Sequence, residues 1–340
     1  MSVSDELDVR ILCGDPRLAY EYGVDGTFSQ EEVEAVEYAC EALSGRPGYR
    51  VSVLDDHSRY IDELRNSPPD LVLNLCDTGY RNQLAQEPNI AAFLEMLGIP
   101  CTGSPPAAMH LCGDKSLVRH VAAAHSIPVP NEKLVDLNAD PLMLPDLYPA
   151  IIKPNGGCGS MGIAPDCVVH DGAEADAVLR RLAGELERPQ ALIQDFLTGP
   201  EYTLGLVGNP ETGFTVLPTL EVDYSDLDPE LPPILAYGSK ADPESAYWRA
   251  LRFRRADLSP EIAAQMIDQA SLLFGRLGFR DYARVDFRAG ADGIPRLLDA
   301  NFNPTWNWDG KMAIMAGWHG MDYGQLLEAI VIAARQRYGI

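Results

Sequence analysis

Short apolar runs alternate with amphipathic segments over the N-terminal third of the chain, and this alternation constrains the fold more than any other feature. The apolar runs predict strands at 9–14, 48–56 and 70–77. Apolar residues at helical spacing predict a helix at 31–43, and another within 89–104 that a glycine stops and a further strand follows. Strand, helix and strand at this spacing predict βαβ units, and therefore a parallel sheet in an α/β protein.

The pattern changes after this region. An aspartate-capped helix is expected within 114–130, and a strand at 148–154 leads into the glycine-rich stretch NGGCGSMG. Strands then dominate, apart from two long helices. One is predicted within 256–278, with a Ser-Pro start at Ser259 and Pro260, and the other at 324–338. These changes place candidate domain boundaries near 114 and 198.

Composition narrows the class of protein. The net charge of −23 argues against non-specific binding to nucleic acid and against docking on anionic membranes, because both require basic patches. The seven cysteines are odd in number and show no metal-binding spacing, which favours a reduced, cytoplasmic protein. The acidic N-terminus does not read as a signal peptide, and no apolar run is long enough to predict a membrane span.

A hairpin near the C-terminus carries the strongest chemical signal. The runs ARVDF (283–287) and LLDAN (297–301) flank AGADGIP, in which Asp292-Gly293 is typical of a two-residue turn. If that turn is tight, two pairs of side chains are opposed on one face of the hairpin: Asp286 with Asp299, and Arg284 with Asn301.

Opposed carboxylates destabilise a hairpin unless something compensates their charge. A divalent cation would do so, because two carboxylates and an amide oxygen are ligands that Mg²⁺ or Mn²⁺ prefers. The alternative is a solvent-facing hairpin in which Arg284 screens both acids.

Other segments have features of a nucleotide site. Lys153 precedes the glycine-rich stretch, whose backbone N–H groups can approach phosphate, and Lys115 opens a helix where an anion is favoured. The segment IQDFL (193–197) can offer backbone groups to a base, with Glu201 near the sugar. Taken singly, each segment also fits an ordinary surface turn, a surface lysine or a plain strand connection.

From about residue 70 to the C-terminus the chain resembles the ATP-grasp superfamily, and within it the D-alanine–D-alanine ligase branch. The matching stretches occur in the family's order and at similar spacing: FLEMLGIPCTGSPPAAMHLCGDKSLVRHVAAAHSIPVP, AIIKPNGGCGSMGI, LIQDFLTGPEYTLGLVG, YARVDF and LLDANFNPTW.

This resemblance implies an ATP-grasp fold, in which an N-terminal parallel α/β domain precedes two α+β domains whose antiparallel sheets clamp ATP. The implied domains are an N-terminal substrate domain at 1–113, a central ATP-grasp subdomain at 114–197, and a C-terminal subdomain at 198–340 that carries the metal and catalytic residues. A homodimer formed through the N-terminal region is also implied.

The resemblance implies roles for the residues of the nucleotide site. Lys115 and Lys153 would contact ATP phosphates, and Gly159 and Ser160 would lie in the loop that closes over them. The adenine hinge would be Gln194, Asp195, Phe196 and Leu197, with Glu201 on the ribose. Two Mg²⁺ ions would be held by Asp286, Asp299 and Asn301, and Arg284 would contact the transferring phosphoryl group.

The substrate motifs depart from those of the cell-wall ligases. Glu21 is the candidate for orienting the first substrate, and the mobile loop keeps Tyr237 and a catalytic Lys240 but has Ala241 in place of a second tyrosine. Thr305 replaces a glycine whose N–H lines the oxyanion hole. Small hydroxyl residues usually bind a D-alanine carboxylate at the positions that Trp306, Asp309 and Lys311 occupy here. The replacement indicates an acceptor substrate that is larger or differently charged. The alternative for the tryptophan is that it only packs against its neighbours.

The implied reaction joins a carboxylate to an amine through an acyl phosphate, with release of ADP and phosphate. The departures in the substrate motifs favour a ligase that makes a dipeptide or related amide from amino-acid-like substrates in specialised metabolism. The alternative is a D-alanine–D-alanine ligase of cell-wall synthesis. A NAD-dependent dehydrogenase would require GxGxxG after the first strand, which is absent. A non-catalytic ATP-binding protein would have lost metal ligands, yet all three candidates are present.

Overall fold

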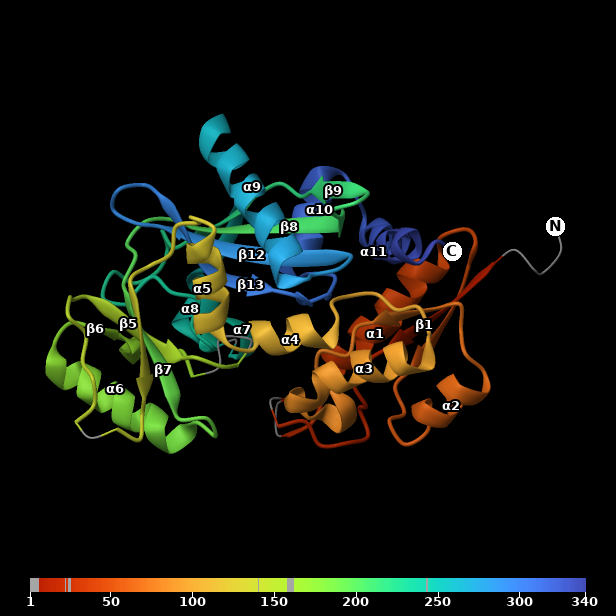
Figure 1. Ribbon diagram of the computed structural model, residues 1–340, viewed down its shortest axis with the longest axis horizontal. Helices are drawn as coiled ribbons and strands as arrows, with labels where there is room; N and C mark the ends of the chain where they lie inside the picture. The colour runs from red at the N-terminus through yellow and green to blue at the C-terminus, as the bar shows by residue number, and fades with distance from the viewer. Residues whose placement is uncertain (1–5, 22, 24–25, 140, 158–161, 243) are drawn as a thin grey trace.

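The computed structural model describes residues 6–21, 23, 26–139, 141–157, 162–242 and 244–340. Within these residues the strands form a three-stranded, a four-stranded and a six-stranded sheet (Figure 1). The first is parallel, and the other two are antiparallel.

The N-terminal sheet confirms the predicted βαβ pattern. Its order is β2-β1-β3, and its strands are β1 (Leu7–Leu12), β2 (Tyr49–Leu54) and β3 (Leu71–Asn74). The helices of this region are α1 (Gln30–Ser44), α2 (Tyr60–Asn66) and α3 (Glu87–Leu97). A capping box between Ser29 and Glu32 begins α1, and left-handed Gly98 ends α3. The strand expected after Gly98 is wrong, because only Cys101 bridges to the sheet.

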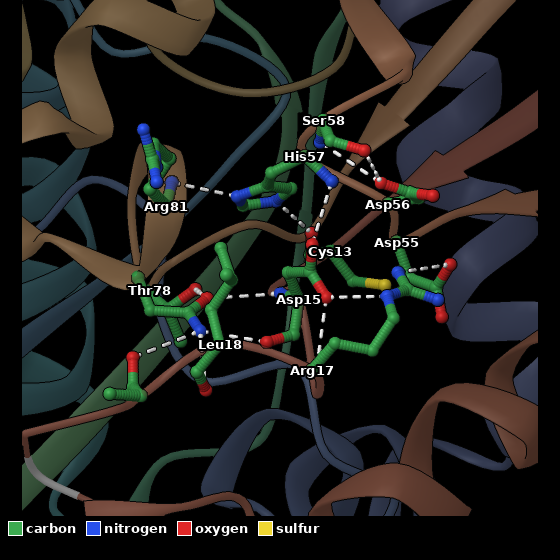
Figure 2. A network of polar contacts seen from close by, with 12 residues as sticks. Cys13, Asp15, Arg17, Leu18, Asp55, Asp56, His57, Ser58, Thr78 and Arg81 are labelled. Atoms are coloured by element: carbon green, nitrogen blue, oxygen red, sulfur yellow. Dashed lines mark hydrogen bonds and ion pairs between the residues drawn. The ribbon is translucent and has the colours of Figure 1, made fainter.

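The loops that follow these three strands are joined by buried hydrogen bonds (Figure 2). Asp15 accepts from Arg17 and from the His57 backbone, and its own N–H donates to Asn82. His57 Nδ1 accepts from the Arg81 N–H, so the ring is neutral, and burial lowers its pKa. Because these groups hydrogen-bond to one another across three loops, the network fixes how the loops lie relative to each other.

The four-stranded sheet has the order β4-β7-β5-β6. Its strands are β4 (Glu132–Asp136), β5 (Ala150–Pro154), β6 (Val168–Val169) and β7 (Gln190–Asp195). Helix α6 (Gly172–Glu185) covers one face (Figure 1) and buries Val178, Leu179 and Leu182 against Ile152 and Ile193. The opposite face is left for the pocket described below.

The six-stranded sheet has the order β11-β10-β8-β12-β13, and β9 also pairs with β8. Its strands are β8 (Glu201–Asn209), β9 (Gly213–Val216), β10 (Leu220–Asp223), β11 (Arg252–Arg255), β12 (Tyr282–Ala289) and β13 (Pro295–Asn301). Every residue of β8 is buried. The short helices α7 (Gly238–Ala241) and α8 (Ala246–Ala250) lie between β10 and β11 in the chain.

Both faces of this sheet are packed. On one side, α9 (Pro260–Leu277) shares a core with α4 (Pro106–Cys112) and α5 (Lys115–Ala124). As predicted, Asp114 caps α5 and Ser259 caps α9. On the other side lie α10 (Lys311–His319) and α11 (Tyr323–Tyr338), and their core continues into the N-terminal sheet through residues such as Ile11 and Leu73. The six-stranded and parallel sheets therefore share one hydrophobic core.

A buried ion pair links α11 to the start of β12. Asp281 is fully buried and receives hydrogen bonds from Arg337 Nη2 at 2.7 Å and Nε at 3.0 Å. The Gly103 N–H and the Asn209 side chain donate to the same carboxylate. Four distant segments of the chain thus meet at one charged group.

Two expectations from composition can be compared with the structure. Among the described residues, no helix is long and apolar enough to cross a membrane. The six cysteines that the structure describes are all free thiols, as the spacing predicted, and Cys158 lies outside the described residues.

Candidate active site

A pocket lined by both charged and apolar side chains lies between the four-stranded and six-stranded sheets. Its charged lining comes from the starts of α5 and α10, the ends of β5 and β7, the start of β8, and the neighbouring strands β12 and β13. The predicted site residues that line it are Lys115, Lys153, Gln194, Asp195, Phe196, Leu197, Glu201, Arg284, Asp286, Asp299, Asn301 and Lys311. Residues separated by as much as 196 positions in the chain thus share one pocket.

The β12–β13 hairpin has the predicted pairs but not the predicted turn. Arg284 is opposite Asn301 and Asp286 is opposite Asp299. The tight Asp292-Gly293 turn is wrong, because Ala289 pairs with Pro295 and leaves a five-residue loop, 290–294. A β-bulge then adds Leu298 to β13, which restores the predicted register at the acidic pair.

The two carboxylates have different partners in the pocket. Asp286 accepts hydrogen bonds from Thr203 at 2.8 Å, Asn301 at 3.0 Å and Arg284 at 3.0 Å. Burial alone would raise the pKa of Asp286, but Arg284, Lys311 and Thr203 outweigh it and hold that pKa below its usual range. Asp299 pairs instead with Lys115 Nζ at 2.7 Å. Arg284 therefore does not screen both acids, and Asp286 is buried, so the solvent-facing alternative does not describe this hairpin.

These side chains fit a divalent cation by their chemistry. Within the described part of the chain, no group of three or more His, Cys, Asp or Glu side chains is suited to a metal ion. The candidate set is therefore two carboxylates and one amide. Asn301 donates through its Nδ2 to Asp286, which leaves its carbonyl oxygen as the candidate ligand.

Two lysines form the cationic side of the pocket. Lys153 is buried at the end of β5, and its burial, followed by the nearby charge of Lys115, lowers its pKa to about 8. The Lys115 backbone N–H donates to the carbonyl of Asn155, which ties the start of α5 to the glycine-rich stretch. Gly156 and Gly157 line the pocket, whereas Gly159 and Ser160 lie outside the described residues.

The other end of the pocket contains the predicted adenine hinge. Gln194 is buried and contacts Glu132, and the Phe196 N–H donates to the carbonyl of Pro149. Glu201 is 6% exposed, and its Oε2 accepts from the hydroxyl of Tyr224 at 2.9 Å. A buried carboxylate therefore stands beside the predicted hinge, and its contact with a ribose stays a prediction.

Among the predicted substrate residues, Lys311 differs from the rest. Its Nζ lies 3.2 Å from Thr203 Oγ1 and 5.5 Å from the centre of the Phe253 ring, and burial lowers its pKa. It therefore lies beside the acidic pair. The described residues that line the pocket do not include the other five: Glu21, Tyr237, Thr305, Trp306 and Asp309. Lys240 belongs to α7, but its side chain is outside the described structure.

Several polar residues at or near the site were not predicted. Two of them are Thr203 and Arg288. The register between β8 and β12 places Thr203 opposite Asp286 and Arg288 opposite Glu201. Period-two alternation along β12 places Arg288 on the same face as Asp286, and this signal could have identified it.

Two further acids lie in the loop after β3 and at the start of α3. Burial raises the pKa of Asp77 to about 6. Burial, and then the charge of Asp77, raise that of Glu87 to about 8, while Asn303 donates to Glu87 at 3.2 Å. No sequence motif marks either residue, because the contact with Asn303 joins positions 216 residues apart.

Residues 143–332, more than half of the chain, match the protein family described as D-ala D-ala ligase C-terminus. A curated relative from Bordetella petrii, named D-alanine–D-alanine ligase, is 28% identical over 291 residues, which cover 84% of this chain and 82% of that protein. The family match, residues 143–332, includes both strands of the acidic hairpin.

Solved structures show the same fold. D-alanine–D-alanine ligase from Bacillus anthracis, complexed with ATP, superposes with a TM-score of 0.72 at 19% identity, covering 98% of this chain and 99% of that one. VanG D-Ala:D-Ser ligase from Enterococcus faecalis gives a TM-score of 0.69 at 16% identity, covering 97% and 99%.

Proposed function

This chain belongs to the D-Ala–D-Ala ligase C-terminus family, so it has the ATP-grasp fold and is a ligase that forms a C–N bond, and we propose that it joins the carboxylate of one amino-acid-like substrate to the amine of another. One observation carries the proposal beyond the family. The pocket gathers Lys115, Lys153 and Arg284 around the opposed carboxylates of β12 and β13.

The roles proposed for these residues follow from their charge. ATP, when bound, supplies the phosphoryl group that activates the substrate carboxylate. Mg²⁺ or Mn²⁺ would neutralise the negative charge of the phosphate groups during this transfer. Asp286, Asp299 and Asn301 would hold the metal. Lys115 and Lys153 would bind phosphate oxygens, and Arg284 would contact the transferring phosphoryl group. Positioning and charge neutralisation suffice for this step, so no side-chain nucleophile is required.

The choice of substrates distinguishes two forms of the proposal. We favour a ligase for a dipeptide or related amide, because Trp306 and Asp309 replace small residues near the expected acceptor. A D-alanine–D-alanine ligase is the second candidate, and the Bordetella petrii relative carries that name. Glu21, Tyr237 and Lys240 remain candidates for the substrate side. The division at 114 and 198, the number of metal ions and a homodimer also remain proposals.

Phosphate release tests this function. Purified protein with Mg-ATP is given D- and L-amino acids in pairs, and product masses are recorded in parallel. We expect release that depends on a particular pair and yields its condensation product. Release with D-alanine alone and a dialanine mass would establish the second candidate. Absence of release with every pair, together with measurable ATP binding, would contradict catalysis of amide formation from amino acids.

We expect ATP binding to weaken as the pH rises above about 8, because of Lys153. Its pKa is lowered to about 8 by burial, then by Lys115, against the opposing charges of Asp299, Glu132 and Glu201. Below that pH the ammonium is present in the free protein, and above it the charge is lost. Phosphate favours the charged form, so binding should take up a proton, and affinity should fall by up to about tenfold per pH unit.

Isothermal titration calorimetry at about pH 7 and about pH 9, in buffers of different ionisation enthalpy, measures this proton uptake. Lys153→Arg is the matched variant, because arginine stays charged over the whole range, and its binding should lose the pH dependence. Affinity of the wild type that does not change between the two pH values would show that Lys153 does not bind phosphate.

A further inference from the structure

A buried arginine in the pocket has no role in the function proposed above. Arg288 lies on β12, two residues after Asp286, and pairs in register with Glu201 of β8. It is only 4% exposed, yet it lines the same pocket as the predicted adenine hinge. A buried guanidinium is costly unless its charge and its N–H groups find partners, so its surroundings indicate what it does.

The guanidinium is held on several sides. Its Nη1 donates to Glu201 Oε2 at 3.3 Å and to the carbonyl of Pro233 at 2.6 Å. Its central carbon lies 5.1 Å from the centre of the Phe196 ring and 5.7 Å from that of Tyr224, both distances at which a cation is attracted to an aromatic ring. Arg288 is therefore fixed in place before any ligand binds.

These contacts also fix Glu201, and they do so through one oxygen. The Tyr224 hydroxyl donates to the same Oε2 that Arg288 reaches. In the described part of the chain, no hydrogen bond reaches the other oxygen, Oε1. Arg288 Nε is buried without a hydrogen-bond partner among the described residues. Glu201 Oε1 thus remains as a hydrogen-bond acceptor beside the hinge, where a nucleotide sugar carries hydroxyl groups.

We infer that Arg288 is a positioning residue for the ribose of the nucleotide, an inference that rests on the proposed function. Together with Tyr224 it holds Glu201 by Oε2, so that Oε1 accepts a hydrogen bond from a ribose hydroxyl. The contribution of Arg288 to binding therefore depends on the ribose hydroxyls.

Equilibrium binding of ATP and of 2′,3′-dideoxy-ATP tests this dependence. Arg288→Met keeps the bulk and removes the charge and donors, and it should weaken ATP binding about tenfold, the value of one hydrogen bond to a charged group. The loss for dideoxy-ATP should be less than about threefold. Tyr224→Phe keeps the ring under the guanidinium and should show a smaller loss with the same dependence. In turnover, the KM for ATP should rise while kcat stays near that of the wild type.

Arg296→Met is the matched control. Arg296 is opposite Arg288 on β13, but it pairs with Asp292 in the hairpin loop and does not line the pocket, so its loss should leave both affinities unchanged. If thermal unfolding shows that Arg288→Met is misfolded, Arg288→Lys and Tyr224→Phe carry the same test. Equal losses for both nucleotides, or no loss for either, would overturn the role of Arg288. Wild-type protein that binds neither nucleotide would contradict the proposed function as well.

Discussion

Arg284→Met is expected to lower kcat for ATP-dependent product formation about a thousandfold, the magnitude found for arginines that stabilise a transferring phosphoryl group. Arg284 lies at the acidic pair, where its Nη2 is 3.0 Å from Asp286. Methionine keeps most of the volume but removes the charge and every donor. The effect should fall on kcat more than on ATP affinity, because the interaction proposed for Arg284 strengthens in the transition state.

Single-turnover phosphate release and equilibrium ATP binding separate these two effects. Arg296→Met serves as the control on the adjacent strand, since its exposed partner Asp292 lies outside the pocket. We expect Arg284→Met to remain folded, because Asp286 still receives a hydrogen bond from Thr203. Thermal unfolding of the variant checks this. Turnover of Arg284→Met within about threefold of the wild type would remove Arg284 from the proposed mechanism.

Arg337→Met is expected to lower the free energy of unfolding by about 3–5 kcal/mol, because it leaves the fully buried Asp281 carboxylate without its cation. The remaining donors, the Gly103 N–H and Asn209, are neutral and do not compensate the charge. Since Arg337 belongs to α11 and also donates to the carbonyl of Cys101, the contact between the N-terminal segment and α11 should weaken with it.

Urea unfolding followed by circular dichroism measures this loss. Arg59→Met is the control, because Arg59 and Glu63 form an exposed pair at the start of α2, and its removal should cost less than about 0.5 kcal/mol. The double variant Arg337→Met/Asp281→Asn should recover part of the stability, since neither charge is then left buried alone. A loss for Arg337→Met no larger than that for Arg59→Met would show that the ion pair contributes little.

The sequence by itself determined the features that depend on near neighbours along the chain. Alternating apolar runs and helical periodicity predicted the parallel N-terminal sheet, and Asp114 and Ser259 marked the starts of α5 and α9. These signals are reliable because successive strand side chains alternate between the two faces of a sheet and a helix start needs a capping side chain, whatever packs against them. The pairing of Asp286 with Asp299 belongs to the same class, although it was reached from a wrong turn.

That pairing also shows where local reasoning ends. The five-residue loop shifts the register by one residue, and the bulge at Leu298 shifts it back. No short-range pattern marks either irregularity, because the bulge is stabilised by the sheet in which β13 is packed. The agreement at the acidic pair therefore depended on two departures from a regular hairpin that cancel.

Only the tertiary structure decided how the charges of the pocket are compensated. Lys115 reaches Asp299 across 184 positions, and Arg288 reaches Glu201 across 87. Such contacts require that two sheets and the start of a helix pack against each other, which depends on the burial of apolar surface throughout the core and on no local motif. Most residues of the site could be predicted from the sequence. Their partners, burial and pKa values depend on tertiary packing.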